Sequence, residues 1–154
     1  LDIYHHRLPA LVDGGYNWVD ARDVARGILL AEEKGHSGEN YLITGHWKSL
    51  LELAAYITRH TGKDTSRTAI PYGMALFFSY FSGAFSRISG RPTNFTPFSM
   101  QSIRCHRLIS HLKATEELGY VPRPFEETVK ETMAWFDSAG MLDGTQKLPI
   151  PALR

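Results

Sequence analysis

Residues 17–25 read Asn-Trp-Val-Asp-Ala-Arg-Asp-Val-Ala, and within these nine positions the sequence changes from strand-like to helix-like. The segment 17–21 holds aromatic and β-branched side chains after the turn signal Asp-Gly-Gly at 13–15, which predicts a strand. From Asp23 onward the apolar residues follow helical spacing, and Gly35 supplies a C-cap. The predicted inward face of this helix consists of Val24, Ile28 and Ala31.

A second strand-and-helix pair is predicted further along the chain. Residues 40–44, Asn-Tyr-Leu-Ile-Thr, form the strand candidate. Ser49 and Glu52 match a capping box, so a helix should begin there, and it should end at residues 61–62, Thr-Gly. Residues 68–70 form a third, very short strand candidate. The inward positions of the second helix are Leu53, Ala54 and Ile57.

The remaining sequence is predominantly helical. Residues 72–89 form an aromatic helix that ends at Gly90, and we expect this helix to be buried or to line a pocket. Thr96 can cap a helix that has Pro97 at its first position. Two further helices are predicted, one over 110–118 that closes at Gly119, and one from Pro124 to Gly140 with Phe125, Val129, Met133 and Phe136 on one face.

This order of elements indicates an α/β fold with few short strands and mostly helices. Two or three short strands and the helices between them cannot by themselves form a parallel sheet with both faces buried. We therefore expect the sheet to continue in sequence outside this chain or in a partner chain.

Composition excludes several classes of function. The 154 residues carry a net charge of +1 and no basic run of the kind that phosphate backbones require, so no nucleic-acid partner is expected. Cys105 stands alone, which excludes an internal disulfide framework. The first ten residues are too polar for a signal peptide, so we expect a cytoplasmic protein. Ser79, Ser82 and Gly83 interrupt the most apolar stretch, so no membrane partner is expected.

Motifs for self-contained chemistry are absent from the sequence. It has no Gly-rich phosphate loop of dinucleotide-binding spacing, no Tyr followed four positions later by Lys, and no Gly-x-Ser-x-Gly elbow. Asp20 and Asp23 could suggest acid–base catalysis, but helix capping explains both carboxylates more simply. Adjacent His5 and His6 point in divergent directions, and we interpret them as a polar surface pair rather than metal ligands.

Three segments, in this order, resemble the extended short-chain dehydrogenase/reductases, also called the NAD-dependent epimerase/dehydratase family. The first is Trp-Val-Asp-Ala-Arg-Asp-Val-Ala at 18–25, which is similar to that family's strand-to-helix segment after the catalytic region. The second combines residues 40–44 with the capped helix at 49–54. The third combines 110–122 with 132–136 and resembles the family's C-terminal signature. Together they cover roughly residues 14–140.

The resemblance implies that this chain is the C-terminal portion of a Rossmann-like enzyme. Residues 1–144 would then be the substrate-binding portion with the last sheet elements, and 145–154 a loose tail. The family's cofactor loop and Tyr-x-x-x-Lys pair would lie upstream of Leu1, so the N-terminal cofactor-binding region is absent here. No catalytic, cofactor-binding or metal-binding residue is carried over to this chain, and NAD or NADP would serve only the intact parent.

The substrate expectation rests on two features. Nucleotide-sugar epimerases of the family often carry an Arg immediately before the equivalent of Trp18, whereas this chain has Tyr-Asn at 16–17. Without that charged donor, a nucleotide-sugar substrate is disfavoured, and the aromatic helix suits an apolar ligand, as in the dihydroflavonol reductase-like branch. The predicted pocket wall consists of Tyr16, Asn17, Trp18, Met74, Phe77, Phe78 and Arg91.

The sequence leaves two main functions open, with a lipid- or membrane-associated helix at 72–85 as a third possibility. The first is the substrate side of an NAD(P)-dependent oxidoreductase or epimerase that acts on a small carbonyl or hydroxyl compound and is inactive alone. The alternative is a non-catalytic interaction module that binds a protein partner through its sheet edge and aromatic surface. A homo-oligomer is compatible with either function.

Overall fold

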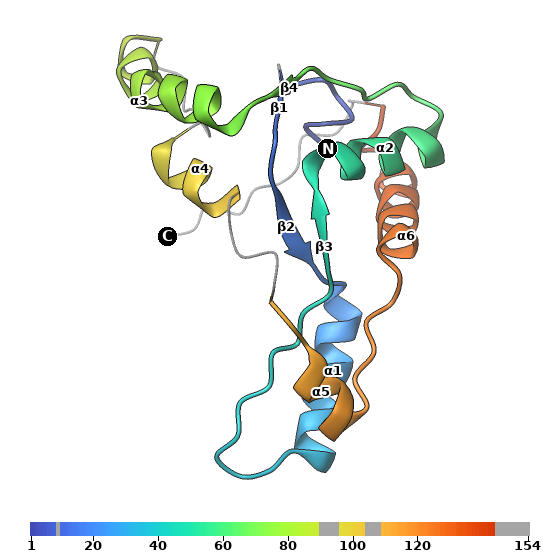
Figure 1. Cartoon of the computed structure of the whole chain (residues 1–154). Coiled ribbons are helices and arrows are strands. Elements are labelled where there is room, and N and C mark those ends of the chain that lie inside the picture. The colour runs from blue at the N-terminus through green and yellow to red at the C-terminus, as the bar shows by residue number, and fades with distance from the viewer. Residues whose placement is uncertain (9, 90–95, 104–108, 144–154) are drawn as a thin grey trace.

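The computed structural model describes residues 1–8, 10–89, 96–103 and 109–143, without the side chains of 82–89 (Figure 1). Helices predominate and the strands are few and short, which confirms the predicted α/β fold class. The strands are β1 (Leu11–Val12), β2 (Gly15–Trp18), β3 (His46–Ser49) and β4 (Ala69–Ile70). The helices are α1 (Ala21–Lys34), α2 (Leu50–Thr61), α3 (Tyr72–Ser89), α4 (Pro97–Ile103), α5 (Leu112–Leu118) and α6 (Phe125–Ser138).

The strands form two separate two-stranded sheets within the described residues. β1 and β4 are parallel, with Leu11 opposite Ala69 and Val12 opposite Ile70. β2 and β3 are antiparallel, with Gly15 opposite Ser49 and Trp18 opposite His46. The short strand predicted at 68–70 is confirmed as β4, whereas β1 was not predicted, because two apolar residues are too short a run to show a period.

The strand predicted at residues 40–44 is wrong, and the strand lies at β3 instead. In the described part of the chain, no backbone–backbone hydrogen bond joins 41–44 to another segment. Tyr41 and Ile43 instead pack on a buried cluster of Ala114, Leu118 and Tyr120. The Tyr120 hydroxyl, whose pKa burial raises, donates to the carbonyl of Thr44 at 3.1 Å. The apolar residues that predicted a strand are therefore buried by side-chain packing on this cluster and not by pairing with another strand.

The beginning of α1 also differs from the prediction. The strand expected over 17–21 ends at Trp18, because Asp20 is the N-cap of α1 and accepts a hydrogen bond from the backbone N–H of Arg22 at 2.9 Å. The buried stripe of α1 contains Asp23 and Gly27. Ile28, predicted to face inward, is 61% exposed.

Most of the predicted helix ends are confirmed. Ser49 and Glu52 form the complete capping box of α2, with the Glu52 N–H donating to Ser49 Oγ at 3.1 Å. Gly62 ends this helix in the left-handed region at φ 70°, where a residue with a Cβ is strained. Thr96 caps α4 by accepting from the N–H of Ser99, and Gly119 closes α5. The tail predicted at 145–154 lies outside the described residues.

The largest buried cluster joins β1 with helices α2 and α6. Ala54 and Ile57 of α2 face Val129 and Met133 of α6, and Phe125 begins the latter helix inside the same cluster. The helical spacing of these α6 residues confirms the predicted apolar face. A second cluster seats α3 and α4 against β1, and α5 packs on α1 at the opposite end of the molecule (Figure 1).

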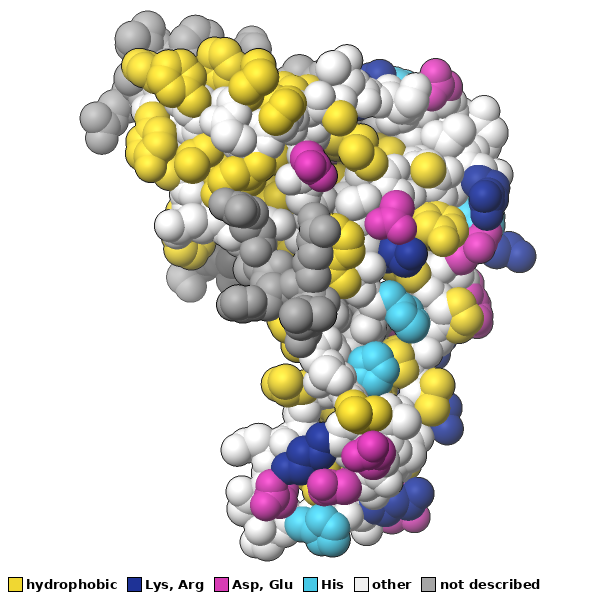
Figure 2. All heavy atoms as spheres, viewed as in Figure 1, with side chains coloured by type: hydrophobic (Ala, Val, Ile, Leu, Met, Phe, Trp, Pro, Cys, Tyr) yellow, Lys and Arg dark blue, Asp and Glu magenta, His cyan; other side chains and the backbone are white. Residues whose placement is uncertain are grey.

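The aromatic helix α3 forms where predicted, but its large side chains are not buried. Phe77 and Phe78 are 61% and 56% exposed, and yellow side chains gather over α3 in Figure 2. Ala75 and Ser79, four residues apart, are the buried side chains on the described part of this helix. The small residues therefore face the core, Tyr72 and Leu76 pack at the edge of the same cluster, and Phe77, Phe78 and Phe81 face outward. Among described residues, no helix is long and apolar enough to cross a bilayer.

Candidate functional site

The antiparallel pair of strands β2 and β3 positions the first three predicted pocket residues. Side chains alternate along a strand, so Tyr16 and Trp18 share one face of β2 and Asn17 lies on the other. The rings of Tyr16 and Trp18 meet edge to face at 5.8 Å. The indole N–H of Trp18 donates to the carbonyl of Lys48 at 3.1 Å, so the neighbouring strand fixes the ring.

The side chain of Asn17 makes a structural hydrogen bond rather than facing a pocket. Its Oδ1 accepts a hydrogen bond from the N–H of Gly45 at 2.9 Å. A Cβ at Gly45 would lie only 1.9 Å from the carbonyl oxygen of Trp18, so the two segments approach as closely as they do because residue 45 is glycine. Asn17 thus holds the entry to β3 in place.

The structure divides the predicted pocket wall into separate groups. Tyr16 packs on the cluster that seats α3, whereas Trp18 packs on the cluster of α2 and α6. Met74, Phe77 and Phe78 lie together on α3, but each is more than half exposed and faces away from that cluster. Arg91 lies outside the described residues.

An apolar cavity that the sequence did not indicate lies beside Trp18. Its volume is about 280 Å³, and among the described residues that line it, Thr128 and Thr132 alone contribute hydroxyl groups. Side chains of α2 and α6 form most of that wall, which therefore required long-range packing to assemble. The cavity is lined by Leu1, Trp18, Val19, Leu53, Ile57, Phe125, Thr128, Val129, Thr132, Met133 and Phe136.

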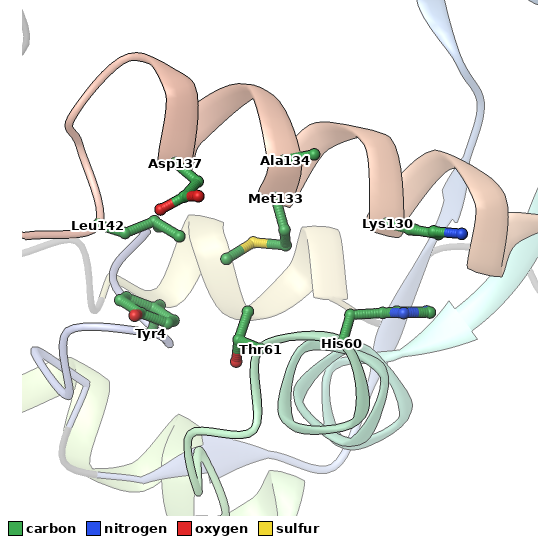
Figure 3. A pocket seen from close by; sticks show the side chains of 8 residues that line it. All are labelled: Tyr4, His60, Thr61, Lys130, Met133, Ala134, Asp137 and Leu142. Carbon is green, nitrogen blue, oxygen red and sulfur yellow. The ribbon is translucent and has the colours of Figure 1, made fainter.

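A more polar groove of about 400 Å³ lies between the end of α2 and α6 (Figure 3). His60 and Lys130 lie at one end of it, Tyr4 and Asp137 at the other, and Met133 between them. His60 Nε2 lies 3.5 Å from a carboxylate oxygen of Glu126 on α6 and has no hydrogen-bond partner among the described residues. The groove is lined by Tyr4, His60, Thr61, Lys130, Met133, Ala134, Asp137 and Leu142.

Two buried carboxylates at the start of α1 anchor distant parts of the chain. Asp23 accepts from the backbone N–H of Arg123 at 2.9 Å and from its Nε at 3.1 Å, and it is 3.0 Å from Nη2. Asp20 accepts from Arg22 Nε and Nη2 at 2.9 and 2.7 Å. Arg22 and Arg123 both also reach Glu131 on α6. The capping role predicted for Asp20 is confirmed, and Arg123 is an anchor that no local sequence signal revealed.

The charge on Asp20 makes a pH-dependent contribution to stability. Hydrogen bonds from the Arg22 side chain hold the pKa of this carboxyl well below its usual range. A depressed folded-state pKa stabilises the fold above the unfolded-state value of about 4, and this contribution is lost as pH falls below it. Asp20→Asn keeps the capping oxygen but removes the charge.

We expect the variant Asp20→Asn to have a lower Tm than the wild type at neutral pH, and the gap to narrow steadily below about pH 4. Thermal unfolding of both proteins across this range measures the gap. A gap of constant size from neutral to acidic pH would mean that the charge of Asp20 contributes nothing to folding.

Neither the cavity, the polar groove nor the carboxylates of α1 form a recognisable cofactor or metal site among the described residues. The part of the chain that the structure describes has no cluster of three or more His, Cys, Asp or Glu side chains that could hold a metal ion. His5, one of the adjacent histidines, has its Nε2 2.9 Å from the carbonyl oxygen of Met141. The glycines of the sequence lack the spacing of a dinucleotide-binding loop, so the residues present do not fit an NAD(P) phosphate site.

The chain is similar in sequence and in structure to several known proteins. No protein-family model matches the chain. It is 31% identical to "Sterol demethylase protein B" of Methylococcus capsulatus, over 92% of this chain and 44% of that protein. It is 25% identical to a "Putative dihydroflavonol 4-reductase" of Synechocystis, over 91% of this chain and 42% of that one. The crystal structure of a nucleoside-diphosphate-sugar epimerase from Pseudomonas aeruginosa matches at 26% identity with a TM-score of 0.65, over 91% of this chain and 41% of that one.

The chain therefore spans less than half the length of the relatives it matches. Those relatives include reductases, epimerases and dehydratases, and each match extends over most of the folded part described above. The ordered segments that resembled one family in the sequence form the start of α1, the capped helix α2 and parts of helices α5 and α6. The chain belongs to the extended short-chain dehydrogenase/reductase family.

Proposed function

We propose that this chain supplies the substrate side of an NAD(P)-dependent reductase, epimerase or dehydratase and does not turn over substrate alone. One observation carries the proposal: about nine-tenths of the chain matches enzymes of which it spans less than half, and its sequence lacks the Gly-rich loop and the Tyr-x-x-x-Lys pair. When bound elsewhere in the enzyme, NAD(P) supplies hydride transfer. The residues of this chain then bind and orient the substrate and exclude water.

The substrate class that the residues favour is a small apolar carbonyl or hydroxyl compound. Tyr16 and Asn17 offer no cation for a diphosphate, and Asn17 is held by Gly45. The outer face of α3 offers large apolar side chains at Met74, Phe77 and Phe78, and Tyr16 packs on the cluster that seats this helix. The names of two relatives, a sterol demethylase protein and a dihydroflavonol reductase, are consistent with an apolar polycyclic substrate.

A chimera tests this function. The part of the Methylococcus capsulatus relative that has no counterpart in this chain would be fused to the chain, and oxidation of NADPH measured with a sterol ketone and a dihydroflavonol. We expect turnover by the chimera and none by either part alone. Turnover by the isolated chain, or a folded chimera that binds NADPH but acts on no carbonyl compound, would refute the proposal.

Within that chimera, Phe78→Ala tests the predicted pocket wall. Loss of a large apolar contact should raise KM for the apolar substrate by about tenfold while the affinity for NADPH stays unchanged. Phe98→Ala removes the same ring from α4, at a residue that we do not place in the wall, and should leave both quantities unchanged. Equal effects of the two variants would remove Phe78 from the pocket.

A further inference from the structure

One end of the molecule presents several exposed aromatic side chains. We define the aromatic face as the exposed large side chains of α3 together with Phe98 on the neighbouring α4, and it lies at the upper left of Figures 1 and 2. Phe98 is 81% exposed and the α3 members are 53–67% exposed. The aromatic face consists of Met74, Phe77, Phe78, Tyr80, Phe81 and Phe98.

The fold holds these rings in place without burying them. Phe77 packs on Phe78 and Phe81 with ring centroids 5.7 and 5.2 Å apart. Ala75 and Ser79 on the opposite side of α3 are 0% and 1% exposed, so the helix is seated on the core through small residues. No α3 residue whose side chain the structure describes lines the apolar cavity beside Trp18 or the polar groove between α2 and α6. Apolar surface of this extent on a folded chain marks a contact surface.

The charge of the surrounding sequence indicates what the aromatic face contacts. Residues 65–109 contain five Arg and no Lys, Asp or Glu. The other 109 residues contain twelve basic and sixteen acidic side chains. The segment that carries α3 and α4 is thus strongly cationic in a chain whose net charge is only +1.

We propose that the aromatic face docks on the surface of an anionic lipid bilayer. Aromatic and apolar side chains on one face of a helix insert at the boundary between headgroups and acyl chains, and nearby basic residues add attraction to anionic lipids. The polar interruptions that argued against a membrane partner concern a helix that spans the bilayer; they leave contact at its surface open. A second copy of the chain fits less well, because it would bring two cationic segments together.

This inference does not rest on the proposed function, since it needs neither cofactor nor substrate. It is compatible with that function, because an apolar substrate dissolved in a bilayer would meet the same face. Failure of the chimera to turn over would leave vesicle binding untouched, and failure of vesicle binding would leave turnover untouched.

Co-sedimentation of the 154-residue chain with vesicles tests the docking. We expect binding to vesicles of phosphatidylglycerol and phosphatidylcholine, little binding to phosphatidylcholine alone, and weaker binding as salt is raised from about 0.1 M to about 1 M. The double substitution Phe77→Ser and Phe81→Ser should lower the partition into anionic vesicles by about tenfold or more. Ile28→Ser with Leu29→Ser, at equally exposed apolar positions on α1, should leave it unchanged.

Three results would overturn the docking. These are no binding of the wild type to anionic vesicles, equal loss in both double variants, or a wild-type dimer in light scattering that Phe77→Ser and Phe81→Ser dissociates without any vesicle binding. Circular dichroism checks that the variants fold. If the α3 variant loses its helical signal, Phe98→Ser replaces it, because an 81% exposed ring has little packing to lose.

Discussion

Replacing Phe125 with alanine is expected to lower the free energy of unfolding by about 3–5 kcal/mol, the range for truncating a buried aromatic side chain. Phe125 is 6% exposed and begins α6 inside the largest core cluster. Its ring lies 5.4 Å from that of Tyr56 on α2 and 6.1 Å from that of Trp18 on β2. It also lines the apolar cavity of about 280 Å³ beside Trp18, so truncation enlarges that cavity.

Urea unfolding followed by circular dichroism measures this loss. Phe98→Ala removes the same side chain from an 81% exposed position and should leave the unfolding free energy nearly unchanged. Similar losses in the two variants would contradict the assignment of Phe125 to the core.

Asp23→Asn is expected to lower the unfolding free energy by about 3 kcal/mol, at the lower end of the range for breaking a buried ion pair. The side chain of Asp23 is 5% exposed, and it joins α1 to a residue one hundred positions away in the sequence. Asparagine would present N–H groups to the donors of Arg123. The loss stays at the lower end because Asp20 and Glu131 remain within 3.8 Å of the guanidinium group.

The matched control is Asp64→Asn, since Asp64 is exposed and accepts a hydrogen bond only from the neighbouring Ser66 in the described part of the chain. It should be indistinguishable from the wild type in the same urea titration. A neutral result for Asp23→Asn would show that the segment around Arg123 is held to α1 by packing alone.

Local signals in the sequence predicted most helix boundaries correctly. The capping box of Ser49 and Glu52, Gly62 and the apolar spacing of α6 each depend on residues within a few positions of one another. The strand at 46–49 was missed in favour of 40–44, because which of two neighbouring extended segments pairs with β2 depends on contacts far apart in sequence. The apolar residues of 40–44 are partly buried, but they pack on α5 and Tyr120 instead of pairing with a strand.

The candidate site was less predictable for a related reason. Aromatic side chains at helical spacing were expected to face the core or a pocket, whereas small residues such as Ala75 determine which side of α3 can approach the core. Helix capping was predicted for Asp23 as well as Asp20, but the N-cap is Asp20 alone and the Asp23 side chain binds Arg123, a partner with no local signal in the sequence. The family resemblance was recoverable because it depended on the order of several motifs rather than on any single pocket residue.

The most direct test of the substrate-side assignment compares the chimera with the intact Methylococcus capsulatus relative. Two quantities are needed from each protein: the Kd for NADPH, and the ratio of kcat/KM for a sterol ketone over a dihydroflavonol. If this chain forms the substrate side, the Kd for NADPH stays as in the relative and the substrate ratio changes. A changed NADPH affinity with an unchanged substrate ratio would contradict the assignment.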